Sequence, residues 1–181
     1  MPNYCHNTLI IEGENKPVSK FKQNLEKKKN YSLEDLFPMP DILSKTMAPS
    51  TTAIGQEYAN QIEIELAERD GEKVPEPIPC SNNTKEKQKD LIKKYGHSDW
   101  YEWKNDNWGT KWIMDFDLVE SINEKLIYTF DSAWAPPIPL LEKISSNYED
   151  LKFSISYNVF EIMGDETELI VIKKGNIEKE K

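Results

Sequence analysis

The stretch Thr8-Leu9-Ile10-Ile11-Glu12-Gly13 begins the regular part of the chain, and an amphipathic segment follows it directly. The stretch is rich in β-branched residues and ends at a glycine, which predicts a first strand. After it, Val18, Phe21 and Leu25 recur on one face at helical spacing, and Pro17 suits a first helical turn. These residues predict a strand followed by a helix that packs one face against a sheet.

Three lysines, Lys27-Lys28-Lys29, come directly after this amphipathic segment. We expect them at the carboxyl end of the helix, where the negative end of the helix dipole stabilises cations. The triplet could also bind an anion, but a solvated helix end is the interpretation that we favour.

The carboxyl-terminal half of the chain is regular again. Its apolar pattern predicts two antiparallel strands joined by the turn Glu120-Ser121-Ile122-Asn123-Glu124, and then a helix and two more strands. We place these elements at 113–119, at 126–130, in a helix that begins at Pro139, at 153–157 and at 169–172. The polar tail from residue 173 is expected to fray.

Taken in order, the elements are strand, helix, insertion, strand, strand, helix, strand and strand. Without the insertion and the last strand, this is the split βαβ order of a ferredoxin-like α+β sandwich, an antiparallel sheet with helices on one face. A chain of 181 residues suits a single domain, 1–181. Residues 31–111 would form a long, mainly helical and loop insertion after the first helix.

Two stretches of the predicted insertion have helical spacing. Residues 58–66 favour a helix, although Ile62, Ile64 and Leu66 also alternate as they would in a strand. The clearer helix covers 81–95, and a glycine follows it directly, as is common at helix ends.

Composition and charge narrow the possible partners. The chain has 32 acidic and 23 basic residues and a formal net charge of -9, and Arg69 is its only arginine. Because phosphate backbones are bound by basic surfaces, and preferentially by arginine, direct nucleic-acid binding is disfavoured. No apolar run reaches membrane-spanning length and the start has no secretory pattern, so we expect a cytoplasmic protein of a host cell, without a membrane partner.

Cys5, Cys80, His6 and His97 are the only cysteines and histidines. Their spacing matches no zinc motif, so the sequence predicts no metal site and no cofactor. A nucleophilic Cys5 beside His6 is also disfavoured, because neighbouring residues of a strand point to opposite faces. We therefore assign no catalytic residues and expect a protein that is not an enzyme.

All five tryptophans fall in one window of the sequence, so we expect them to meet in the fold. Large aromatic side chains are enriched in cores and in binding hot spots, so the cluster is either a local core or a binding surface. Core is the interpretation that we favour. The cluster comprises Trp100, Trp103, Trp108, Trp112 and Trp134.

Three motifs of this sequence recur together in one known family: Met1-Pro2-Asn3-Tyr4-Cys5-His6-Asn7, Asn107-Trp108-Gly109-Thr110-Lys111-Trp112 and Phe130-Asp131-Ser132-Ala133-Trp134-Ala135-Pro136-Pro137. Through them the chain resembles the YubB ferredoxin-like-domain family of plasmid and phage proteins. The family usually starts Met-Pro-Asn-Trp-Cys with an Asn two places on, so Tyr4 replaces one aromatic residue with another. The segment Leu36-Phe37-Pro38-Met39-Pro40 also looks like the Pro-Met-Pro loop of that family. The resemblance implies a mobile-element origin and a ferredoxin-like sheet, but no catalytic assignment.

If the tryptophan motifs form a site, we expect an aromatic-walled cleft with one cation and one anion. Its binding residues would be Trp108, Lys111, Trp112, Asp131 and Trp134. The interpretation that we favour is a structural lock, in which these residues hold the insertion and the neighbouring turns in place.

Three functions remain open. The preferred hypothesis is a non-enzymatic phage or plasmid accessory protein that binds a host protein, inhibiting a host defence or nuclease component through an acidic or tryptophan-rich surface. The second is a protein that binds a small, nucleotide-like ligand in a tryptophan-lined cleft. The third is a metal-dependent hydrolase that uses Asp115, Asp117 and Asp131, which lie on neighbouring predicted strands.

Overall fold

The computed structural model describes residues 3–46, 85–159, 162, 164 and 166–178. The chain divides into two compact units, one formed by Met1–Pro38 with Lys104–Lys181 and the other by Met39–Trp103. The helix predicted at 58–66 lies outside the described residues, and the single domain with an insertion at 31–111 stays a prediction. None of the described helices is long and apolar enough to cross a membrane.

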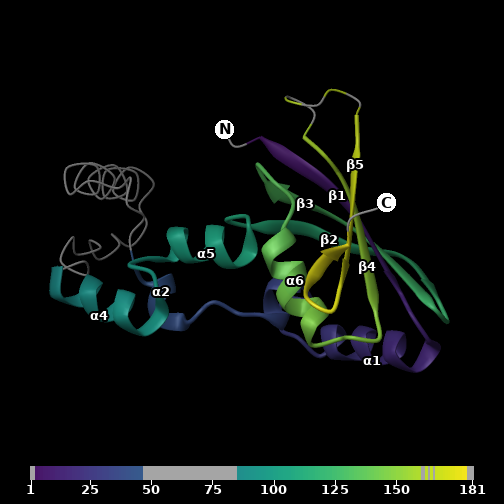
Figure 1. The fold of residues 1–181 in the computed structure, drawn as a ribbon, viewed down its shortest axis with the longest axis horizontal. Coiled ribbons are helices and arrows are strands. Elements are labelled where there is room, and N and C mark those ends of the chain that lie inside the picture. The colour runs from purple at the N-terminus through teal and green to yellow at the C-terminus, as the bar shows by residue number, and fades with distance from the viewer. Residues whose placement is uncertain (1–2, 47–84, 160–161, 163, 165, 179–181) are drawn as a thin grey trace, which may run out of the picture. The chain divides into compact units, whose positions relative to one another are not determined.

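The first unit is built on an antiparallel six-stranded sheet (Figure 1). Its strands and main helices are β1 (Tyr4–Glu12), α1 (Asn15–Glu26), β2 (Ile113–Ile122), β3 (Lys125–Ala133), α6 (Ile138–Ser146), β4 (Lys152–Asn158), β5 (Glu168–Lys173) and β6 (Asn176–Glu178). The strand order is β2-β3-β1-β4-β5-β6. The first four of these strands, connected through α1 and α6, form the split βαβ arrangement. The predicted ferredoxin-like α+β fold is therefore confirmed.

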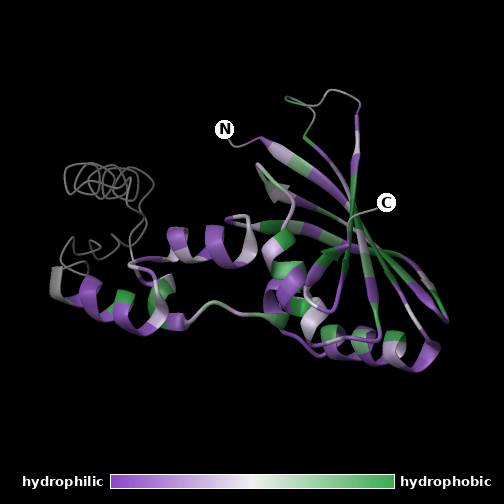
Figure 2. Ribbon diagram, viewed as in Figure 1, coloured by the Kyte–Doolittle hydropathy of each residue, from purple (hydrophilic) through white to green (hydrophobic). Residues whose placement is uncertain are grey.

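The core of this unit lies between the sheet and its helices. Buried residues alternate with more exposed ones along β1, and Leu9 and Ile11 are fully buried. Phe21 of α1 meets Phe153 of β4 edge to face, with 5.8 Å between the ring centroids. Figure 2 shows apolar and polar residues alternating along α1, as a helix with one buried face requires. The sheet thus has a buried face and a second face, called here the polar face, on which His6 lies.

Several element ends differ from the sequence predictions: β1 begins at Tyr4 and not at Thr8, and β2 runs to Ile122, through part of the turn predicted at 120–124. α1 ends at Glu26 and Lys27 is its C-cap, so the lysine triplet lies at the carboxyl end of the helix, as the sequence predicts. The tail does not fray directly after β5, because Lys174 and Gly175 have φ angles of 50° and 78° and form a hairpin turn to β6.

The second unit contains α2 (Asp41–Ser44), α4 (Lys85–Tyr95) and the start of α5 (Trp100–Trp108), whose residues from Lys104 onward belong to the first unit. α4 confirms the described part of the helix predicted at 81–95, and Gly96 after it has a φ of 80°. At the start of α5, Asp99 Oδ1 accepts hydrogen bonds from the N–H groups of Tyr101 and Glu102 at 2.9 and 3.0 Å. Asp99 therefore acts as an N-cap.

Candidate functional site

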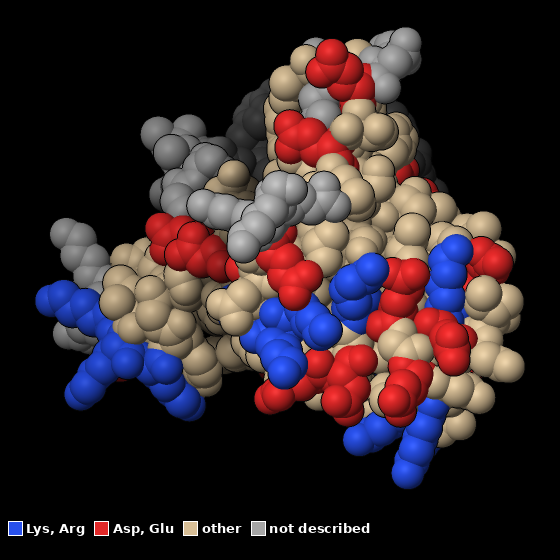
Figure 3. Space-filling model, turned by 45° about the vertical axis from the view of Figure 1, so that its right-hand side comes forward, with Lys and Arg blue, Asp and Glu red and all other residues tan. Residues whose placement is uncertain are grey.

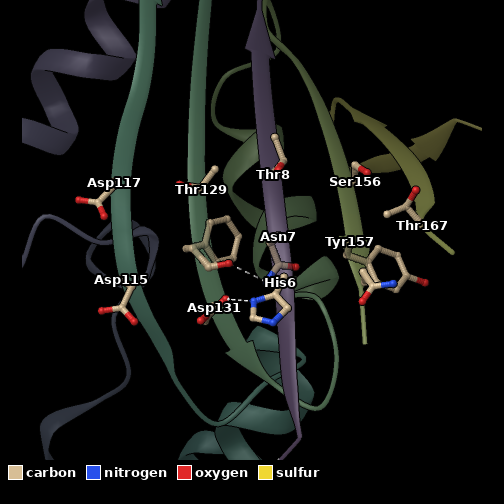
Figure 4. A pocket seen from close by; sticks show the side chains of 12 residues that line it. His6, Asn7, Thr8, Asp115, Asp117, Thr129, Asp131, Ser156, Tyr157 and Thr167 are labelled. Atoms are coloured by element: carbon tan, nitrogen blue, oxygen red, sulfur yellow. Dashed lines mark hydrogen bonds and ion pairs between the residues drawn. The ribbon is translucent and has the colours of Figure 1, made fainter. Parts of the chain in front are cut away.

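A hollow on the polar face of the sheet gathers carboxylate, hydroxyl and amide side chains from neighbouring strands (Figure 4). Its volume is about 400 Å³. Three of its lining residues are aspartates, and no lysine or arginine is among them. We call it the aspartate hollow. Its polar and charged lining includes Asp115 and Asp117 of β2, Thr129 and Asp131 of β3, His6 and Thr8 of β1, and Ser156 and Asn158 of β4.

A β-bulge brings both aspartates of β2 onto this face. Met114 pairs with Asp131 and Asp117 pairs with Thr129, so β2 has one residue more than β3 between these pairs. Asp115 lies at the bulge with a φ of 52°, a conformation that Asp adopts more readily than most residues other than glycine. Backbone conformations of this kind are concentrated at functional sites.

His6 and Asp131 form the closest polar contact in the hollow. They lie directly opposite each other on β1 and β3, and His6 Nδ1 is 2.6 Å from Asp131 Oδ1. The His6 side chain is 62% exposed and that of Asp131 is 23% exposed. Because Nδ1 faces the carboxylate, Nε2 is the imidazole nitrogen that can meet a ligand.

On the buried face of β1, the side chain of Asn7 links this strand to β3 by hydrogen bonds. Its Nδ2 donates hydrogen bonds to Cys5 O at 2.8 Å, to Ser132 Oγ at 2.9 Å and to Phe130 O at 3.3 Å. Cys5 is fully buried, and burial raises the pKa of its thiol to about 11. The thiol is therefore protonated at neutral pH and is no nucleophile. The expectation that Cys5 and His6 point to opposite faces is confirmed.

Hydrogen bonds also fix the side chains at the end of β4, which lines the other side of the hollow. Asn158 Nδ2 donates to the carbonyl oxygen of Gly164 at 2.8 Å and to that of Glu166. The Tyr157 hydroxyl donates to the Glu168 carboxylate. Burial, together with this carboxylate, raises the pKa of Tyr157 to about 12, so Tyr157 stays a neutral donor at physiological pH.

The aspartates of the hollow lie apart, Asp115 and Asp117 on β2 and Asp131 on β3 (Figure 4). Among the described residues, no group of three or more His, Cys, Asp or Glu side chains is placed to hold a metal ion. The metal-dependent hydrolase with Asp115, Asp117 and Asp131 stays a prediction, because magnesium is often held by one or two carboxylates together with water. Carboxylates spread along a hollow suit several separate cations, such as the ammonium and guanidinium groups of a protein.

Of the five residues predicted for a tryptophan-lined cleft, only Asp131 lines the aspartate hollow. Trp108 is 4% exposed, and its Nε1–H donates to Phe37 O at 2.9 Å. Lys104 Nζ lies 4.5 Å from the centroid of the Trp108 ring and donates to Lys111 O at 3.1 Å. Trp108 and the Lys111 backbone thus take part in internal packing contacts.

The residues between Trp108 and Trp112 join the two tryptophan motifs. Thr110 Oγ1 donates to Ala133 O at 3.0 Å and accepts a hydrogen bond from the Ala133 N–H at 2.9 Å. Gly109 has a φ of 77°, and a Cβ at this position would lie 2.6 Å from Cδ of Pro139. These are the contacts of a structural lock, while a binding role for the five residues stays a prediction.

Two aromatic residues of the motifs lie beyond this lock. The rings of Trp112 and Tyr4 are 5.4 Å apart. Trp134 is 50% exposed with a φ of 69°, and its N–H donates to Asn3 O at 3.0 Å. Because Trp134 follows Ala133, whose partner on β1 is Tyr4, it lies at the same end of the sheet as the hollow.

Sequence reasoning missed His6 as a site residue. The predicted first strand began at Thr8, whereas β1 begins at Tyr4. If the strand is extended toward the start of the chain with its two-residue period, His6 and Thr8 fall on the same face, opposite Leu9 and Ile11. That alternation was the signal that could have found the site, but polar residues precede Thr8 and obscure the start of the strand.

Known families and structures support the same fold. Residues 107–169 match a family model described as "Ferredoxin-like domain in Api92-like protein". The crystal structure of protein api92 from Yersinia pseudotuberculosis is similar with a TM-score of 0.52 and 12% sequence identity, over 98% of this chain and 96% of that one. Among curated protein sequences, none matches. These similarities show the fold, and they do not confirm the YubB name.

Proposed function

We propose that this ferredoxin-like protein is a non-enzymatic accessory protein of a phage or plasmid that acts by binding a host protein. The proposed binding surface is the polar face of the sheet, with the aspartate hollow receiving lysine or arginine side chains. A host nuclease or a DNA-binding defence component is the proposed class of partner, because such proteins carry basic grooves for phosphate. The mobile-element origin rests on the resemblance of the sequence motifs alone.

The charge of the hollow is the observation that carries this proposal. Asp115 and Asp117 line it, no lysine or arginine does, and neither carboxylate forms an ion pair with a described residue. Asp131 is already paired with His6. A cation of the partner would therefore reach Asp115 and Asp117 without displacing a basic group of this chain.

Exposed apolar side chains at the same end of the sheet also support a protein partner. Met114 pairs with Asp131 across the strands, and Met114, Tyr4 and Trp134 are all exposed. Binding hot spots commonly combine aromatic anchors with charged groups. A metal ion or a small polar ligand would leave these apolar side chains unused.

The test compares wild type with the Asp115→Asn, Asp117→Asn double variant. Asn also tolerates the positive φ at position 115, so the bulge should persist. The control is Glu149→Gln with Asp150→Asn, which changes the charge equally at two exposed residues outside the hollow. Each purified protein is crosslinked in lysate of the native host, and the captured protein is then purified for affinity measurements.

We expect wild type and control to bind the same host protein with equal affinity. The double variant should bind it at least about tenfold more weakly, because two charge-assisted contacts are lost. Added salt should weaken the wild-type complex. Unchanged affinity of the double variant, or an equal loss in the control, would contradict the proposed surface.

A further inference from the structure

A second hollow lies on the helix-covered side of the first unit and differs in charge from the aspartate hollow. Its volume is about 470 Å³. Residues from α1, from the 3-10 helix η1 (Leu33–Leu36) and from the end of α6 line it. Three lysines are among them but no carboxylate, although the whole chain has a net charge of -9. We propose that this lysine hollow, which contains Lys20, Lys27 and Lys28, binds the phosphate chain of a di- or triphosphate.

The lysines are arranged to act together. Lys20 and Asn24 are separated by one helical turn and share a side of α1, and Lys27 and Lys28 continue that side past the end of the helix. In the described part of the chain, none of the three lysines forms an ion pair. Their charges are therefore available to an anion.

Neutral donors complete the hollow. Asn24 Nδ2 donates to the Tyr148 hydroxyl oxygen at 3.1 Å, so the hydroxyl hydrogen of Tyr148 can be donated elsewhere. The Tyr148 ring is held edge to face against Phe21, with 5.0 Å between the ring centroids. A phosphate oxygen in the hollow would thus meet a hydroxyl donor whose ring is already fixed in position.

The helix dipoles oppose anion binding here but are outweighed. The carboxyl ends of α1 and α6 each carry roughly half a negative charge. Three lysine side chains supply three full positive charges close to them. The net positive charge that remains suits a ligand with several negative charges, such as a polyphosphate, better than a ligand with a single negative charge.

The experiment titrates the full-length chain with tripolyphosphate by isothermal calorimetry at low salt. The test variant is Lys27→Gln with Lys28→Gln, two exposed residues beyond the end of α1. The control is Lys16→Gln with Lys173→Gln, which removes the same charge at exposed positions outside the lining. A further variant, Tyr148→Phe, keeps the ring contact and removes the hydroxyl.

We expect binding by wild type and the control, a loss of about tenfold or more for the double lysine variant, and a smaller loss for Tyr148→Phe. A nucleoside triphosphate that binds as tightly as tripolyphosphate would show that the phosphates alone are recognised. Tighter nucleotide binding would support a nucleotide as the source of the phosphate chain. No heat with wild type, or equal losses in the test and control variants, would overturn the proposal. The outcome is independent of the proposed protein partner, because the two hollows share no lining residue.

Discussion

His6 and Asn7 are neighbours in the chain but belong to opposite faces of β1. His6 is exposed and paired with Asp131 in the hollow. Asn7 is buried and makes three hydrogen bonds with its amide, which is how a buried polar group avoids a loss of stability. The polar start of the chain therefore contains one candidate site residue and one structural residue.

The buried thiol of Cys5 leads to a prediction about chemical reactivity. Burial raises its pKa to about 11, so the thiolate that reacts with iodoacetamide is scarce in the folded protein. At about pH 8 we expect Cys5 to stay unlabelled in the native protein and to be labelled once urea unfolds the chain. Peptide mass spectrometry measures this, and rapid native labelling of Cys5 would contradict the buried position.

Gly109 tests the structural lock between the tryptophan motifs. Gly109→Ala would place a Cβ 2.6 Å from Pro139 and strain a φ of 77°, whereas Gly164→Ala strains a φ of 60° with no atom within 4 Å. We expect Gly109→Ala to lower the free energy of unfolding by about 1–3 kcal/mol more than Gly164→Ala, because of the added clash. Urea denaturation measures the difference, and equal effects would show that Pro139 can move aside.

The short helix η1 supports the aspartate hollow from outside it. η1 is tied to the start of β2, because Glu34 Oε1 accepts a hydrogen bond from the Ile113 N–H at 3.2 Å. β2 is an edge strand, and its two register shifts interrupt the row of backbone groups that could pair with another sheet. The bulge that presents Asp115 therefore also discourages edge-to-edge association.

The link from η1 to β2 predicts a pH dependence of stability. Burial raises the pKa of the Glu34 carboxyl above its ordinary value of 4.5, although Lys104 pulls it down. The folded state therefore binds this proton more tightly than the unfolded state does. The stability from protonated Glu34 is present below the ordinary pKa and is lost as the pH rises through the raised pKa. Glu34→Gln keeps an acceptor for Ile113 without this loss.

Urea denaturation between about pH 4 and pH 7 checks the Glu34 prediction. We expect the unfolding free energy of Glu34→Gln, relative to wild type, to increase as the pH rises. Glu149→Gln, at an exposed position, should show little change of this kind. A constant difference between Glu34→Gln and wild type across this range would contradict the assigned effect of burial.

On the surface of the first unit, the two hollows differ from their surroundings in charge, because each is lined by charged residues of mainly one sign. Figure 3 shows lysines and carboxylates interleaved over much of the face that it presents. The aspartate hollow has no lysine or arginine in its lining and the lysine hollow has no carboxylate. One ferredoxin-like sandwich can therefore present an acidic surface on its sheet and a basic one among its helices.

The order of elements and the main buried stripes could be predicted from the sequence because they depend on local periodicity. The stripe of Val18, Phe21 and Leu25 is buried as expected, and the strands of the carboxyl-terminal half lie where the alternation indicated. Only the tertiary structure decided which distant residues meet. The opposition of His6 and Asp131 depends on the pairing of β1 with β3, which are more than a hundred residues apart in the chain. Likewise, the three aspartates line one hollow because of a β-bulge in β2. A regular two-residue alternation does not predict a bulge, because the bulge depends on how two strands pair and not on either strand alone.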